Sequence, residues 1–223
     1  MRRFFAVILC VSLLLVPVRA EGEEKYVALT FDDGPSGRFT RALLEGLRQR
    51  NARASFFLCG YRVELYPREA LQILEEGHEI GIHGFSHDPM DPMTEDQITD
   101  QIRRTARLLP RYAHPVFLRP PGGLTCDALR VAAKRDGLAI LSWSVDPQDW
   151  AIRDPEAIVD TVVSRVRDGD VVLLHDMSDS SVEAALRIVD ILSKRGFRFV
   201  TVTELAQIKG HTLKPGKEYY RFS

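Results

Sequence analysis

The sequence predicts an α/β fold in which about seven parallel strands are joined by helices. Apolar runs of strand length alternate with amphipathic stretches along almost the whole chain, which is the pattern of parallel strands with crossover helices. The length of 223 residues and the apolar share of 45% suit one domain around a single core. Two architectures fit this pattern, a closed barrel and an open doubly wound sheet. Both bind ligands at the carboxyl ends of their strands.

The first twenty residues differ from the rest and predict an export signal. Arg2 and Arg3 make a basic start, residues 4–16 are almost wholly apolar, and Val18 and Ala20 are small residues before a cleavage point. The apolar run is shorter than the roughly 18 to 20 residues that a membrane-spanning helix needs. We therefore expect cleavage after Ala20, which leaves one domain over residues 21–223. An uncleaved membrane anchor is the alternative.

The charge balance and the cysteines set two further limits. Loss of Arg2, Arg3 and Arg19 with the signal leaves 27 basic against 31 acidic residues, so nothing favours nucleic acid as a partner. The exported part keeps Cys59 and Cys126. Export permits a disulfide between them, but the sequence does not decide whether they pair.

The expected strands and helices follow one another in regular order. Two of the helices have clear starts: Thr94 and Gln97 form a capping box, and Asp154 is an N-cap followed by Pro155. A third helix opens near Ser180, three residues before Glu183. We expect the polar residues 209–223 to form a loosely packed tail. The strands are expected at residues 26–31, 54–58, 79–82, 116–118, 139–145, 171–174 and 197–202.

Five of the seven expected strands are followed by charged or metal-binding side chains. Because the carboxyl ends of parallel strands meet at one edge, we expect these side chains to form a single site. In chain order the clusters are Asp32 with Asp33, His83 with His87, Arg119, then Asp146 with Asp149 and Trp150, and lastly His175 with Asp176.

Each cluster alone also fits an ordinary structural role. Adjacent aspartates before Gly-Pro are typical of a turn, and a His-x-x-x-His pair can be two exposed loop residues. Together, however, two neutral imidazoles and one carboxylate on one side of a divalent ion leave positions open for water and substrate. The ion would also offset the repulsion between Asp32 and Asp33. One aspartate would be a metal ligand and the other would be free to act as a base.

Five motifs in this order resemble the polysaccharide deacetylase family, which is carbohydrate esterase family four and is also called the NodB homology domain. The motifs are "TFDDGP", "HGFSH", "RPPGG", "DPQDW" and "VVLLHD", and the resemblance runs from about residue 26 to about residue 205. It implies a distorted barrel of parallel strands, with residues 21–223 as the catalytic domain. It also implies metal-dependent hydrolysis of N-acetyl groups on the amino sugars of a polysaccharide.

The resemblance also implies roles for individual residues. Asp33 is similar to the family's metal-binding aspartate, with His83 and His87 as the other protein ligands. Asp32 resembles the general base that takes a proton from the attacking water. Arg119 resembles the arginine that holds this base by a charge-assisted hydrogen bond.

The resemblance assigns the remaining roles to residues of the later motifs. His175 resembles the general acid that protonates the leaving amine, and Asp149 resembles the partner that tunes it. Trp150 and Leu173 resemble the walls of the small pocket that receives the acetyl methyl group. The tetrahedral oxyanion would be shared between the metal and a backbone N–H near Gly122.

Two positions depart from the family pattern. Gly84 stands where the family usually has Ser or Thr, whose hydroxyl steadies the loop. Gly122 stands where Tyr is common, so its N–H remains but no ring is offered to the substrate. We expect an active enzyme with a more open cleft.

The cofactor expected is a divalent metal, with zinc favoured and cobalt, manganese or nickel also accepted by two histidines and one aspartate. The expected partner is an N-acetylated polysaccharide, either cell-wall peptidoglycan or a chitin-like glycan, and no stable protein partner is implied. The export signal would place the enzyme outside the cytoplasm at the cell wall. Which sugar is attacked stays open.

Two other readings remain. A carbohydrate-binding protein on the same barrel would have lost turnover, and its usual mark is the loss of a base, an acid or a ligand. A glycoside hydrolase would use two carboxylates among Asp32, Asp33 and Asp149, and it would work in the presence of a chelator.

Overall fold

The computed structural model describes residues 24–223, so the expected export signal lies outside the described residues. An eight-stranded sheet runs in the order β6-β1-β2-β3-β4-β5-β8, and β7 pairs with the first residues of β1. The named strands pair in parallel throughout. They are β1 (Lys25–Gly34), β2 (Ser55–Leu58), β3 (Glu79–Ile82), β4 (Phe117–Leu118), β5 (Ala139–Leu141), β6 (Val171–His175), β7 (Phe197–Phe199) and β8 (Glu218–Tyr219).

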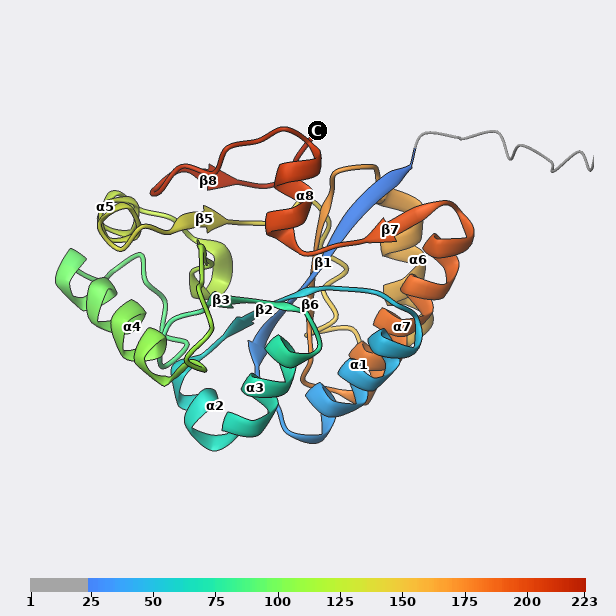
Figure 1. Cartoon of the computed structure of the whole chain (residues 1–223), viewed down its shortest axis with the longest axis horizontal. Helices are drawn as coiled ribbons and strands as arrows, with labels where there is room; N and C mark the ends of the chain where they lie inside the picture. The colour runs from blue at the N-terminus through green and yellow to red at the C-terminus, as the bar shows by residue number, and fades with distance from the viewer. Residues whose placement is uncertain (1–23) are drawn as a thin grey trace, which may run out of the picture.

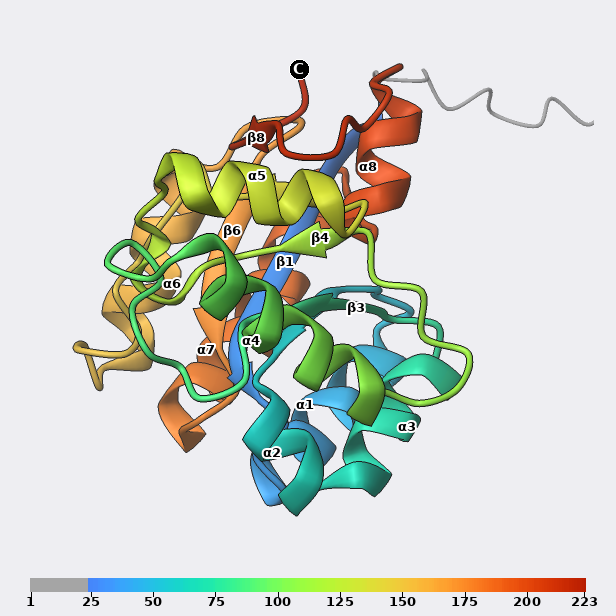
Figure 2. The ribbon, with the colours of Figure 1, turned by 90° about the vertical axis from the view of Figure 1, so that its left-hand side faces the viewer.

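The sheet curls into a distorted barrel, as the family resemblance implies (Figure 1). Closure comes from the chain that leaves β5, because Val145 forms a parallel bridge with Val172 of β6 and accepts a hydrogen bond from Leu173 N at 2.9 Å. β5 is therefore shorter than the expected strand at 139–145, and its continuation is a single bridge. In Figure 2, β6 and β1 run side by side.

Helices cover the outside of this barrel. On the side of β1 and β6, α7 lies between α1 and α6 and contacts both of them (Figure 1). Within residues 24–223 none of the helices has the length and apolar character needed to cross a bilayer. The helices are α1 (Arg38–Gln49), α2 (Gly60–Leu65), α3 (Pro67–Glu75), α4 (Glu95–Leu108), α5 (Asp127–Arg135), α6 (Pro155–Arg165), α7 (Asp179–Lys194) and α8 (Val202–Ile208), with a 3-10 turn η1 at Pro121–Gly123.

Two of the expected helix starts are confirmed and one is wrong by two residues. Thr94 and Gln97 make both bonds of a capping box, and Asp154 caps α6 ahead of Pro155. Helix α7 is capped by Ser178 rather than by Ser180. The Ser178 backbone is extended and its hydroxyl accepts from the backbone N–H of Ser181, so the helix already begins at Asp179.

Strand β1 separates two apolar layers. Val27, Leu29 and Phe31 belong to the core that packs against the helices, whereas Ala28 belongs to the cluster inside the barrel. Side chains alternate along a strand, so Thr30 and Asp32 also face inward. The inner face of β1 thus changes from apolar to polar towards its carboxyl end.

The expectation of a loose tail at residues 209–223 is wrong. β8 pairs with β5, and Tyr219 and Phe222 are buried with their ring centroids 5.6 Å apart. Two aromatic residues among polar neighbours are enough to dock the segment, because each aromatic side chain buries a large area. The tail thus supplies the eighth strand of the sheet, Glu218–Tyr219.

The two cysteines of the described chain are both free. Cys59 is buried, and Cys126 caps α5 by accepting a hydrogen bond from Leu129 N at 3.4 Å. The disulfide that export would permit is therefore absent from residues 24–223.

Candidate active site

A break in strand regularity brings Asp32 and Asp33 to the same site. In a regular strand these neighbours would point to opposite faces. The pairing of β1 with β2 shifts between Asp32 and Gly34, and Asp33 has a φ of 70°, in the left-handed region. A bulge of this kind turns one side chain away from the strand's alternation. Asp33 consequently faces two histidines of the loop after β3.

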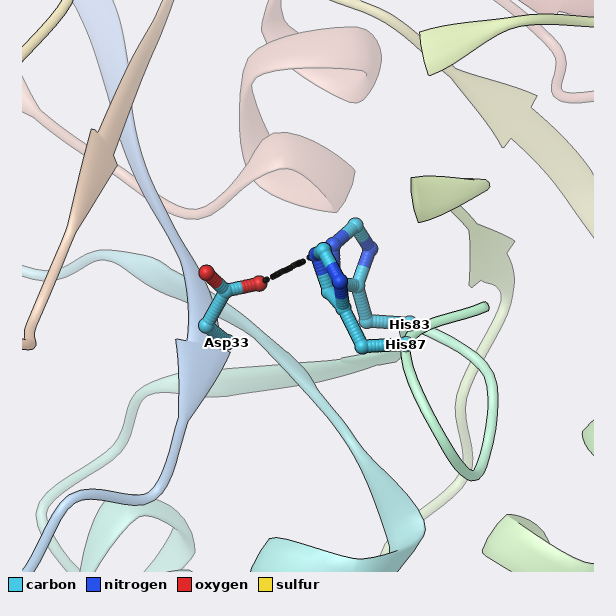
Figure 3. A group of neighbouring side chains, drawn as sticks. All are labelled: Asp33, His83 and His87. Atoms are coloured by element: carbon cyan, nitrogen blue, oxygen red, sulfur yellow. Dashed lines mark ion pairs between the residues drawn. The ribbon is translucent and has the colours of Figure 1, made fainter. Parts of the chain in front are cut away.

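Asp33, His83 and His87 form the one cluster of metal-ligating side chains found among residues 24–223, with one atom from each within 4.8 Å of the others (Figure 3). Asp33 Oδ1 lies 2.9 Å from His87 Nε2 and 3.3 Å from His83 Nε2. His83 is buried, whereas His87 is partly exposed and has a φ of 62°. The expected ligand set is thus brought together.

The tautomer of His83 favours metal binding. His83 Nδ1 lies 2.8 Å from the carbonyl oxygen of Arg119, so Nδ1–H donates there and Nε2 keeps its lone pair towards Asp33. Among the described residues, the buried Asp33 Oδ1 has no hydrogen-bond partner. Three electron-rich atoms that converge in this way fit a divalent cation.

The electrostatics of Asp33 agree with a ligand role. Burial raises the pKa of the Asp33 carboxyl, but His83 and His87 lower it by more, and the net pKa lies well below the usual range. The group is therefore ionised at neutral pH, which is the form that binds a metal.

The loop that carries the histidines is fastened by helix α4. Gln101 Oε1 accepts from the backbone N–H of Phe85 at 2.7 Å and of Ser86 at 3.1 Å, and Thr105 Oγ1 donates to Gly84 O at 2.7 Å. Gly84 has a φ of 79°, and a Cβ there would lie 2.8 Å from Met90 Cε. The support expected from a hydroxyl at position 84 comes here from α4.

Asp32 is held by a buried arginine. Arg119 Nη1 donates to Asp32 Oδ1 at 2.7 Å and to Thr30 Oγ1 at 2.8 Å, while Nε and Nη2 donate to the carbonyls of Leu141 and Ser142 at 3.0 Å each. The other carboxylate oxygen, Asp32 Oδ2, lies 3.7 Å from His83 Nε2. Asp32 therefore presents one fixed oxygen towards the metal-ligand cluster.

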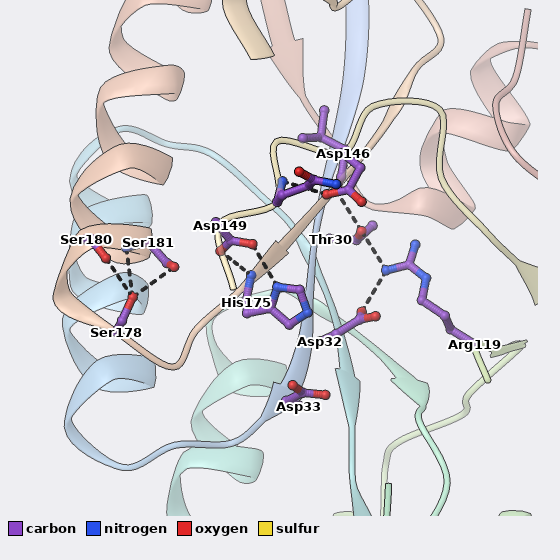
Figure 4. A network of polar contacts seen from close by, with 12 residues as sticks. Thr30, Asp32, Asp33, Arg119, Asp146, Asp149, His175, Ser178, Ser180 and Ser181 are labelled. Carbon is purple, nitrogen blue, oxygen red and sulfur yellow. Dashed lines mark hydrogen bonds and ion pairs between the residues drawn. The ribbon is translucent and has the colours of Figure 1, made fainter. Parts of the chain in front are cut away.

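His175 lies beside Asp32 because the two residues are register partners on the parallel strands β6 and β1. Asp149 anchors it: Asp149 Oδ2 accepts from the backbone N–H of His175 at 2.9 Å, and Oδ1 lies 2.8 Å from Nδ1 (Figure 4). Burial lowers the pKa of His175, but the hydrogen bond and charge of Asp149, together with the charges of Asp32 and Asp33, outweigh it, and the pKa is raised to about 9. The imidazolium form, with Nε2–H free, is thus populated at neutral pH.

The three expected substrate residues lie on different elements of the described chain. Leu173 is buried on β6 in register with Thr30, which places it on the inner face two residues before His175. Trp150 follows Asp149 and is exposed. Gly122 lies in η1 with a φ of 72°, and a Cβ there would meet nothing within 4 Å.

Sequence reasoning missed several supporting residues. Thr30 shares the Arg119 guanidinium with Asp32, and its inward position on an otherwise apolar strand was the signal available. Gln101 and Thr105 act from helix α4, which carries none of the five family motifs. The bonds of Asp176 were not foreseen either, although the residue stands next to His175.

The chain is similar to known proteins over most of its length. Residues 19–141 match the family model described as polysaccharide deacetylase. A peptidoglycan-N-acetylglucosamine deacetylase of Bacillus cereus is 40% identical over 83% of this chain and 90% of its own length. The peptidoglycan-N-acetylmuramic acid deacetylase PdaC of Bacillus subtilis is 36% identical over 83% of this chain, which spans 40% of that longer protein.

A solved structure gives the same result for the fold. The family 4 acetyl xylan esterase from Clostridium thermocellum, in complex with a cobalt ion, superposes with a TM-score of 0.82 at 34% identity, over 88% of this chain and 98% of that one.

Proposed function

The chain belongs to the polysaccharide deacetylase family, and we propose that it hydrolyses the N-acetyl groups of amino sugars in cell-wall peptidoglycan through Asp33, His83 and His87 as metal ligands. The observation that carries this proposal is the meeting of this cluster with Asp32 and His175 at the ends of β1 and β6. A metal-dependent deacetylase needs a cation site, a base and an acid within reach of one amide.

The residues of the cluster would hold the cation through Asp33 Oδ1 and the two Nε2 atoms. A divalent ion bound there supplies Lewis-acid chemistry, which polarises the amide carbonyl and makes a nearby water more acidic. Zinc is the metal we propose, since it accepts this mixed set of nitrogen and oxygen ligands.

Asp32 is the proposed general base. The Arg119 bond to Oδ1 fixes its orientation and stabilises its charge, so Oδ2 can accept a proton from the water that attacks the acetyl carbon. The new C–O bond forms as that proton leaves the water.

His175 is the proposed general acid. Its Nδ1–H is held by Asp149, which leaves Nε2–H to protonate the amide nitrogen as the C–N bond breaks. Free amine and acetate are the products. Leu173 and Trp150 would enclose the acetyl methyl group, and the backbone N–H near Gly122 would stabilise the oxyanion.

The substrate and location belong to the same proposal. The two relatives of Bacillus are named for N-acetylglucosamine and N-acetylmuramic acid in peptidoglycan. We favour N-acetylglucosamine because the relative named for this sugar matches the present chain over 90% of that relative's own length. The basic and apolar start of the sequence supports export to the wall, where this glycan lies.

Acetate release by the purified protein tests this function. Peptidoglycan fragments and chitooligosaccharides are incubated before and after chelator treatment and after zinc return. We expect release from peptidoglycan that the chelator abolishes and zinc restores. Release that persists in chelator would overturn the metal-dependent mechanism. No release from either glycan by protein with a full metal site would favour a carbohydrate-binding protein.

A further inference from the structure

Asp176 ties the end of β6 to the turn that follows β1. It is fully buried and directly follows His175. Its carboxylate Oδ2 accepts a hydrogen bond from the Thr40 hydroxyl, and its backbone carbonyl accepts one from the Ser36 hydroxyl. Ser36 N–H in turn donates to Thr40 Oγ1 at 2.7 Å. Asp176 therefore reaches Ser36 by two routes, one through its side chain and one through its backbone.

The side chain of Asp176 also packs against the bulge that orients Asp33. A Cβ built on Gly34 would lie 2.7 Å from Asp176 Oδ1, a distance that real Cβ atoms do not adopt. Gly34 is the residue at which the register of β1 resumes after Asp33 is skipped. The carboxyl group of Asp176 thus fills the space beside the bulge, and only glycine permits this approach.

Folding alone does not favour a carboxyl group in this position. Asp176 Oδ1 has no hydrogen-bond partner among the described residues, and burial raises the pKa of Asp176 to about 7 even though the Thr40 bond lowers it. A buried acid with an unused acceptor destabilises a fold relative to an apolar side chain of similar size. Its contacts point instead to a role in the geometry of the site.

We propose that Asp176 is a positioning residue, which holds the turn from Gly34 to Ser36 against the end of β6 and so fixes the metal ligand Asp33 relative to His175. The proposal rests on the roles proposed above for Asp33 and His175. Its first test measures metal binding, which can be read whether or not the protein deacetylates a glycan.

The test compares Asp176→Ala with Asp176→Asn. Cobalt(II) alone is the probe, and its affinity and visible absorption spectrum report the number and arrangement of ligands. Loss of a group that supports a ligand typically weakens metal binding by about 10- to 100-fold. We expect Asp176→Ala to show such a loss with an altered spectrum. Asp176→Asn should restore both, because its amide oxygen can still accept from Thr40.

Asp170 provides the matched control. It is a buried aspartate at the opposite end of the same strand, where it accepts hydrogen bonds from Ser144 Oγ at 2.9 Å and from the backbone N–H of Arg167 at 2.6 Å. We expect Asp170→Ala to lower the melting temperature while the cobalt affinity and spectrum stay as in the wild type. An equal loss of cobalt binding in Asp170→Ala would reduce Asp176 to a contributor to general stability and overturn the proposal.

Turnover gives the second readout. If the wild type releases acetate, Asp176→Ala should lower kcat by about tenfold or more with little change in KM, and Asp176→Asn should recover it. Folded Asp176→Ala with wild-type cobalt affinity, spectrum and kcat would overturn the proposal. If Asp176→Ala does not fold, Thr40→Val removes only the hydroxyl that bonds the carboxylate, and wild-type cobalt binding in that variant would be equally decisive against it.

The outcomes separate this proposal from the proposed function. A wild type that binds cobalt but releases no acetate from any glycan would remove the deacetylase assignment. Weakened cobalt binding in Asp176→Ala would still support the positioning of Asp33 in that case.

Discussion

Arg119 and Asp32 form an ion pair inside the barrel, with Nη1 and Oδ1 2.7 Å apart and both side chains buried. The guanidinium also lies over the ring of Phe57, with 4.2 Å between Cζ and the ring centroid. Its Nε and Nη2 groups donate to backbone carbonyls, and Nη1 also donates to Thr30 Oγ1. A buried pair of this kind stabilises only while both partners are present, because loss of one leaves an uncompensated charge.

Replacement of Arg119 by Met should therefore destabilise the fold by about 3–5 kcal/mol, the range for a broken buried pair. Urea denaturation measures this change. Arg119→Lys keeps the charge but cannot make the four side-chain bonds seen here, so we expect an intermediate loss. A Met variant as stable as the wild type would show that Asp32 does not depend on this partner.

Asp32→Asn should separate catalysis from metal binding. The amide preserves the shape of the side chain but cannot accept the proton, so kcat should fall by about 100- to 10,000-fold while the protein still binds zinc. Asp33→Ala, His83→Ala and His87→Ala should lose the metal as well. Metal analysis of the purified variants checks this, and equal zinc content in Asp32→Asn and Asp33→Ala would overturn the assignment of Asp33 as the ligand and Asp32 as the base.

The pH profile should report His175 on its alkaline side. An acid acts in its protonated form, and the pKa of about 9 means that activity should hold through neutral pH and fall as the pH rises through 9. Asp149→Asn removes the carboxylate that raises this pKa, so the alkaline limb should move to lower pH. The pH dependence of kcat/KM for both proteins measures the shift, and an unmoved limb would rule out Asp149 as the tuning partner.

Gln101→Ala should loosen the loop between Gly84 and His87, since Gln101 accepts from two of its backbone N–H groups. Zinc affinity should fall by about 10- to 100-fold, as for other groups that orient a ligand. Gln97→Ala on the same helix is the control. Gln97 belongs to the capping box, so its loss should cost stability and leave the affinity unchanged. Calorimetric titration with zinc distinguishes the two variants.

Phe222→Ala should destabilise the whole barrel by about 3–5 kcal/mol, the usual cost of emptying a buried aromatic site. Phe222 is fully buried and packs on Tyr219 of β8. Thermal unfolding measures the change. A loss below 1 kcal/mol would mean that the tail is only weakly attached.

The alternation of apolar and polar segments was sufficient to predict seven strands and the edge at which the site lies. The packing of the tail was not predicted because the expectation of a loose segment rested on its polar composition. Tyr219 and Phe222 are instead ordered by contacts with strands that are distant in the sequence. Ser178 was missed as a cap for a similar reason, since three serines in the neighbourhood offer a hydroxyl and only backbone geometry selects one.

The site shows the same division between chemistry and geometry. The motifs identified the residues that can bind metal or transfer protons, because only a few residue types can carry out these tasks. They did not predict how Asp33 leaves the alternation of β1, nor that Gln101 and Thr105 hold the histidine loop from α4. Both depend on the three-dimensional path of the backbone, which cannot be predicted from the spacing of motifs in the sequence.

The left-handed backbone of Asp33 and His87 also limits which residues can replace them at the proposed metal site. Among residues other than glycine, Asn, Asp and His adopt positive φ most readily, so the backbone restricts these positions before coordination chemistry does. Glutamate at position 33 would keep a carboxylate but would lose that conformational preference and add a methylene. Asparagine would suit the backbone and lose the charge. Few single substitutions can therefore change the metal preference of this protein without first deforming the loop that presents the ligand.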